Sequence, residues 1–144
     1  MASNREATGL VALRLFLGVF FLSEGLTKLR WFLNSEQLAT RLAEWLQGAN
    51  AWSAWYLKHV AIPYVEVFSR LVVLGELCCG IALIAGLFTR PAAILGFLMV
   101  LNFHFASSAL FKYAFFTNGY GLPVLGGLLA LAIGAGRLPW SVKG

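Results

Sequence analysis

Four long apolar stretches take up most of the 144 residues, and they limit what the chain can fold into. They lie at 9–29, 63–88, 91–110 and 120–138. Each is close to the roughly 20 residues that an α-helix needs to cross the hydrocarbon core of a bilayer. Only 12% of the residues are charged, against about a quarter in a typical soluble domain. The sequence therefore predicts an all-α integral membrane protein, a four-helix transmembrane bundle that forms a single domain over residues 1–144.

The first apolar stretch is similar in position to a secretory signal peptide. Arg14 interrupts its apolar region, however, and no small-x-small cleavage pattern follows. Lys28, Arg30 and Trp31 mark its end with the cationic and aromatic side chains that favour the bilayer interface. We therefore expect this stretch to be retained as the first span.

The segment 30–62, between the first two spans, is the only sizeable polar part of the chain. Within it, Leu38, Leu42, Trp45 and Leu46 recur at helical spacing. This pattern predicts an amphipathic helix that lies along the membrane surface. A docking surface for a partner protein is the alternative interpretation of the same residues.

The net charge of +5 comes from eleven Lys and Arg residues that lie scattered along the chain and form no run. This distribution favours membrane anchoring, so we expect no nucleic-acid partner. The basic residues divide almost evenly between the two sides of the predicted bundle, and the positive-inside rule therefore constrains the topology only weakly. Because the short Thr89–Arg90 turn fits a cytoplasmic loop, we expect both termini to be cytoplasmic.

Several charged residues lie within or at the ends of the first two spans. Placing one such residue near the centre of a membrane-spanning helix costs about 2.5 to 3.5 kcal/mol. Antiparallel packing would bring them into one register as three pairs: Glu24 with Arg70, Lys28 with Glu66, and Arg14 with Glu76. The last pair carries an axial offset of about 6 Å, which a long arginine side chain can bridge. The sequence thus predicts a ladder of three ion pairs between the first two helices.

The predicted ladder has two interpretations. In the structural one, the paired charges satisfy one another and fix the register of the helices. In the functional one, they line a polar pocket for a proton path or for a quinone headgroup. Glu76 is then the best candidate for a functional carboxylate, because it lies near mid-span and matches its partner least well.

His104 is the one histidine in a predicted span, with Ser108 one turn further on. It is either a packing residue or a group that hydrogen-bonds a quinone carbonyl or relays a proton, since imidazole titrates near neutral pH. Cys78 and Cys79 are adjacent, so their side chains point about 100° apart on a helix, which favours packing over a disulfide. We expect no metal site, because no carboxylate, His or Cys cluster has metal-ligand spacing.

Three segments carry a recognisable family pattern: LRLFLGVFFLSEGLTKL, VLGELCCGIALIAGLFTRPAAILGFLMVLNF and NGYGLPVLGGLLALAIGAG. Their most specific parts are Arg14-x-x-x-Gly18 with Gly25-x-x-Lys28, Glu76-x-x-x-Gly80 with Gly86-x-x-Thr89-Arg90, and Gly134-x-Gly136. In order and spacing these segments, which cover all four spans, resemble the DoxX-type (DoxX/DoxD-like) membrane proteins.

The resemblance implies a four-helix protein of the bacterial or archaeal plasma membrane. Members of this family include small subunits of thiosulfate:quinone oxidoreductase, a subunit type linked to methylamine dehydrogenase maturation, and parts of oxidative-stress membrane complexes. An acidic residue often follows the last Gly-x-Gly in the family, whereas here Gly136 is followed by RLPWS. Any role of that acid is therefore not expected in this chain.

Two functions remain open at this point. The first is a small anchoring or accessory subunit of a bacterial plasma-membrane redox complex, in which Arg14, Glu76 and His104 shape a site for a non-covalent quinone. The second is a non-redox scaffold or assembly protein, whose ion pairs only hold its helices together. Because no residue set here oxidises a substrate by itself, we expect the chain to act with other subunits and the lipid bilayer, and not as an enzyme alone.

Overall fold

The computed structural model describes residues 3–136 and 138–142, and within these ranges the protein is helical and has no strand. The longer helices are α1 (Asn4–Thr27), α5 (Val65–Ala85), α6 (Thr89–Ala106) and α7 (Leu122–Gly134). The shorter ones are α2 (Leu29–Leu33), α3 (Glu36–Gln47), α4 (Ala51–Tyr56), the π-helical turn η1 (Leu57–Ala61), and the 3-10 turns η2 (Ala109–Phe111) and η3 (Tyr113–Phe116). The predicted all-α fold is confirmed.

Three of the described helices, α1, α5 and α6, are long and apolar enough to cross a membrane. α7 has 13 residues, about 20 Å at 1.5 Å per residue, and is shorter than the roughly 30 Å hydrocarbon core. It begins at Leu122, after a turn at Tyr120–Gly121, and ends at Gly134. The predicted stretch 120–138 is thus helical over only part of its length, and a four-span bundle stays a prediction.

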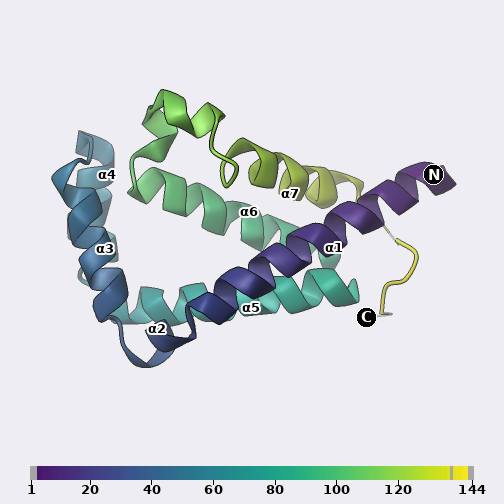
Figure 1. The fold of residues 1–144 in the computed structure, drawn as a ribbon, viewed down its shortest axis with the longest axis horizontal. Coiled ribbons are helices and arrows are strands. Elements are labelled where there is room, and N and C mark those ends of the chain that lie inside the picture. Colours follow the sequence, from purple (N-terminus) through teal and green to yellow (C-terminus); the bar gives the residue numbers. More distant parts are fainter. Residues whose placement is uncertain (1–2, 137, 143–144) are drawn as a thin grey trace.

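The bundle is built around the antiparallel pair α1 and α5, with α6 and α7 beside them (Figure 1). Glycines let the two backbones approach closely. A Cβ atom at Gly80 would lie 2.5 Å from the backbone nitrogen of Leu22, and one at Gly18 would lie 2.9 Å from that of Ile84. Any larger side chain at these positions would force the two helices apart.

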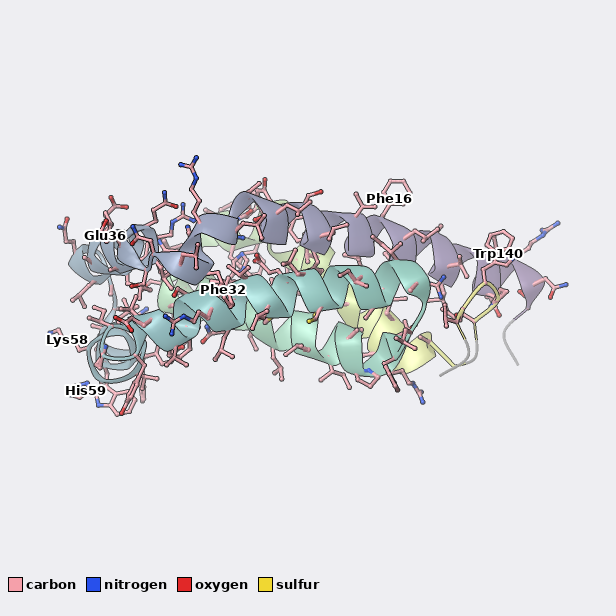
Figure 2. The ribbon with its side chains drawn as sticks, turned by 90° about the horizontal axis from the view of Figure 1, so that it is seen from below. Phe16, Phe32, Glu36, Lys58, His59 and Trp140 are labelled. Carbon is pink, nitrogen blue, oxygen red and sulfur yellow. The ribbon has the colours of Figure 1, made fainter. Side chains whose placement is uncertain are left out.

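The main apolar core lies between these four helices and includes Phe21, Leu83 and Leu128. Large apolar side chains also cover the outside of the bundle, and Phe16 points away from α1 in Figure 2. Contiguous apolar surface of this kind is expected where a helix faces lipid.

Segment 30–62 folds into the α2–α4 block, by which we mean α2, α3, α4 and η1. The block lies across one end of the bundle, opposite the first and last described residues (Figure 1). The amphipathic helix predicted from Leu38 and Leu42 is present as α3, but its apolar side packs against the chain's own Trp31, Val72 and Val73. Glu36, Lys58 and His59 mark the polar outer side of the block.

Candidate functional site

The charged residues of α1 and α5 pair differently from the predicted ladder. Lys28 is the C-cap of α1, and its Nζ lies 2.8 Å from Glu24 Oε2 on α1 and 2.8 Å from Glu76 Oε1 on α5. These are the ion pairs among residues 3–136 and 138–142. The predicted pairings were wrong: Glu24 with Arg70, Lys28 with Glu66, and Arg14 with Glu76.

The register of α1 against α5 explains the difference. Gly25 lies against Leu77 and Gly18 against Ile84, so α5 is displaced relative to the predicted register by about two helical turns, or about 11 Å. Close glycine contacts, which the charge pattern does not reveal, set this register. Lys28 is thereby brought level with Glu76.

The remaining charges of the predicted ladder lie apart from this pair. Glu66 and Arg70 are exposed near the start of α5, where Arg70 Nε donates to the carbonyl oxygen of Phe32 at 3.3 Å. Arg14 is at the other end of α1 and donates to Ser141 Oγ at 2.6 Å and to the carbonyl oxygen of Trp140 at 3.0 Å. Arg14 therefore does not join Glu76 and His104 in one site.

A cavity of about 410 Å³ opens between α1, α5, α6 and the α2–α4 block, and we call it the Glu76 cavity. Its charged and titratable lining residues are Glu24, Lys28, Arg41, Glu76 and His104. Its aromatic lining residues are Phe20, Phe21, Trp31, Trp45, Phe103 and Tyr120. The structure thus brings together two of the predicted site residues, Glu76 and His104, inside largely apolar walls.

Glu76 is 4% exposed, and both of its carboxylate oxygens accept from Lys28 Nζ, at 2.8 and 3.0 Å. Lys28 also lies 5.8 Å from the centre of the Trp31 ring, within reach of a cation–π contact. One ammonium group therefore serves two carboxylates, those of Glu24 and Glu76. Such a buried charge is tolerated only when paired and hydrogen-bonded.

His104 is buried on α6, with its ring edge-on to Phe115. Its Nδ1 lies 2.8 Å from the carbonyl oxygen of Val100. A carbonyl oxygen only accepts, so Nδ1 carries a proton, and in the neutral form of the ring Nε2 keeps a free lone pair. Nε2 has no hydrogen-bond partner among the described residues and is the ring nitrogen left for a ligand in the cavity.

A family model for DoxX matches residues 9–109, which is more than half of the chain. The chain belongs to the DoxX family. Searches of curated proteins and of solved structures found no match. The DoxX match includes Lys28, Glu76, His104 and the whole α2–α4 block. With its apolar helices, this DoxX protein is a membrane protein that contacts lipid.

Beside the Glu76 cavity, the DoxX protein has a polar recess of about 580 Å³, whose lining includes Thr27, Thr40 and Glu44. The recess and the cavity share the walls formed by Glu24, Lys28, Trp31 and Arg41. Glu24 and Lys28 therefore stand between the buried Glu76 and the polar outer surface of the block.

Several lining residues were not among the predicted site residues. Trp45 was assigned only to the apolar side of a surface helix, and Lys28, a residue of the predicted ladder, was paired with Glu66 and not with Glu76. Tyr120 enters the cavity because the turn before α7 brings it beside Phe20, with ring centres 5.9 Å apart. The number of aromatic residues within segment 30–62 was the available signal for Trp31 and Trp45.

The two cysteines lie outside the Glu76 cavity. Both are free thiols, with Cys78 exposed and Cys79 buried against the carbonyl oxygen of Ala92 at 3.5 Å. Within the part of the chain that the structure describes, no three His, Cys, Asp or Glu residues come together to hold a metal ion.

Proposed function

We propose that this DoxX protein is an anchoring or accessory subunit of a bacterial plasma-membrane redox complex, and that its Glu76 cavity takes a quinone headgroup. The observation that carries the proposal is the convergence of Lys28 from α1, Glu76 from α5 and His104 from α6 on one cavity with aromatic walls. Its volume of about 410 Å³ lies in the range of about 300–1,000 Å³ that is usual for small-molecule sites.

The lining residues fit the chemistry of a quinone, which takes up two electrons and two protons when it is reduced to the quinol. Flat side chains such as Trp31 and Phe103 match a planar ring. His104 Nε2 is an acceptor for a hydroxyl group of the reduced form, whereas the three N–H groups of Lys28 already donate to Glu24 and Glu76. Glu76, held by Lys28, is placed to accept a proton inside the cavity.

We also propose that the chain crosses the membrane four times. The first and last described residues lie at the same end of the bundle (Figure 1), which supports an even number of crossings. α7 would be the fourth span, and a short span of this kind is accommodated by local thinning of the bilayer. Both termini would then lie on one side of the membrane, which we propose is the cytoplasmic side, and a partner subunit would exchange electrons with the quinone.

A binding titration tests the quinone site. The purified protein in detergent is titrated with decyl-ubiquinone while the tryptophan fluorescence is recorded, because Trp31 and Trp45 both line the cavity. We expect saturable quenching, and in a parallel titration with the reduced form, decyl-ubiquinol, a His104→Ala variant that binds about tenfold more weakly, because only the quinol has a hydroxyl group to donate to His104 Nε2. His59→Ala is the matched control, because His59 is exposed and outside the cavity. Quenching that does not saturate would contradict the proposal.

A structural role is the second candidate function, and one observation favours it. Lys28 satisfies both Glu24 and Glu76, so the charges are paired within the chain and need no ligand. If the charges are only structural, Glu76→Gln will lower the thermal stability and His104→Ala will change neither the stability nor any quinone binding.

A further inference from the structure

We propose that the end of the molecule opposite the α2–α4 block binds the phosphate headgroup of an anionic phospholipid. The site is a hollow of about 720 Å³ between the α5–α6 turn and the C-terminal segment, which we call the Arg90 hollow. Its lining includes Gly86, Phe88, Thr89, Arg90, Trp140 and Ser141. None of these residues lines the Glu76 cavity, so the inference does not depend on the quinone proposal.

Arg14 supplies buried positive charge directly behind the wall of the hollow. It is 1% exposed, it donates to Ser141 and Trp140, and its Nε has no hydrogen-bond partner in the described ranges. The guanidinium occupies the place where a Cβ atom of Gly86 would lie, so Gly86 and Ser141 separate it from the hollow. A buried cation without a counter-ion is costly, and an anion in the hollow would offset part of that cost.

No carboxylate side chain is available nearby to compensate Arg14. The sequence contains no Asp or Glu after Glu76, which lies near the middle of α5, about 15 Å along the helix from Gly86, and pairs with Lys28. Glu6 is about two helical turns from Arg14 along α1, and its carboxylate accepts from the backbone N–H of Ser3. Positive charge therefore dominates this end of the described structure.

Arg90 and the start of α6 add to the positive potential. Arg90 is exposed in the first turn, and its Nη2 donates to the carbonyl oxygen of Ile133 at 3.0 Å, which leaves its other N–H groups for a ligand. The 18-residue helix begins without a side-chain cap at Phe88. The uncapped N–H groups and the helix dipole favour an anion at this position.

The rim of the hollow indicates a lipid rather than free phosphate. Phe88 and Trp140 are 64% and 81% exposed, and Trp140 stands at this end of the molecule in Figure 2. The hollow also lies at the ends of α5 and α6, two helices long enough to span a membrane, where lipid headgroups are found. Exposed apolar side chains around a basic site would contact acyl chains, and inorganic phosphate would make no use of them.

Native mass spectrometry of the full chain in detergent tests the site. The protein is incubated with equal amounts of phosphatidylglycerol and phosphatidylcholine that carry the same acyl chains. We expect the unchanged protein to retain phosphatidylglycerol in preference to phosphatidylcholine. Arg90→Gln should reduce this preference about tenfold. Arg90→Lys should keep most of the preference. Arg30→Gln is the matched control, since it removes an exposed arginine of α2, at the opposite end of the molecule.

Three results would overturn the proposal. The first is equal retention of the two lipids by the unchanged protein. The second is an equal loss of preference in Arg90→Gln and Arg30→Gln, which would indicate a general charge effect. The third is complete displacement of phosphatidylglycerol by excess inorganic phosphate, which would show that the site takes free phosphate. Circular dichroism of each variant checks that loss of the Arg90–Ile133 hydrogen bond has not unfolded α6 or α7.

Discussion

Lys28, which caps the C-terminus of α1, shares its ammonium group between two carboxylates, that of Glu24 one turn earlier and that of Glu76 on α5, each at 2.8 Å. The pair with Glu76 joins the two central helices and forms one wall of the Glu76 cavity. A single residue therefore contributes both to the stability of the bundle and to the chemistry of the proposed site.

Replacing Lys28 is expected to destabilise the protein strongly. Lys28→Met leaves Glu76 buried without a cation, which costs about 3–5 kcal/mol for a buried pair, and thermal unfolding in detergent measures the loss. The double variant Lys28→Met with Glu76→Met should recover most of the stability, because no uncompensated charge is left. Lys58→Met is the control, since Lys58 is exposed. If the double variant is no more stable than Lys28→Met, the ion pair is not the cause.

The close approach of α1 and α5 is expected to depend on Gly80. In Gly80→Ala the new methyl group would collide with the backbone of Leu22, and such overpacking costs about 1–3 kcal/mol. Gly126→Ala is the matched control, because a Cβ atom at Gly126 has no heavy atom within 4 Å. Unfolding midpoints should fall for the first variant and stay level or rise for the second. Equal midpoints would show that the helices are not held at glycine contact distance.

The α2–α4 block is expected to lose stability at alkaline pH, because the buried phenol of Tyr56 then ionises. Burial raises the pKa of the Tyr56 phenol above its ordinary value of 10.0, and the protonated phenol donates to Asn102 Oδ1 at 2.7 Å. The folded state therefore holds this proton more tightly than the unfolded state. The resulting stability is present below pH 10 and is lost as the pH rises through the folded pKa. Removing Tyr56 should remove this loss.

Chemical unfolding on both sides of pH 10 measures the effect. Tyr56→Phe should lose less stability between the two pH values than the unchanged protein does, whereas Tyr64→Phe, a change at an exposed tyrosine, should behave like the unchanged protein. If all three lose the same stability, Tyr56 does not contribute to the alkaline transition.

Hydropathy and helical periodicity predicted the helical elements well. The apolar stretches became α1, α5 and α6, and the spacing of Leu38 and Leu42 predicted α3, because these patterns report local structure directly. The register of α1 against α5 was not predictable in the same way. Matching charges favoured Lys28 with Glu66, whereas the contacts at Gly18, Gly25 and Gly80 decide the register by fixing how closely the backbones approach.

The residues of the candidate site were partly predictable from the sequence, whereas their arrangement in space was not. Glu76 and His104 were identified from their chemistry, since an ionisable residue in a span is unusual wherever it lies. Their shared cavity depends on how α5 and α6 pack and on the turn that brings Tyr120 beside Phe20. Arg14, chosen by the same reasoning, lies about four helical turns from Lys28 along α1 and contacts the C-terminal segment instead.

Photolabelling with an azido-quinone tests the central claim, that the Glu76 cavity takes a quinone headgroup, most directly. We predict that the label attaches to peptides that line the cavity, those containing Trp31, Trp45 or Phe103, and that excess unlabelled quinone prevents the attachment. Labelling spread over outward-facing positions such as Phe16 and Ile133, and unaffected by unlabelled quinone, would contradict it.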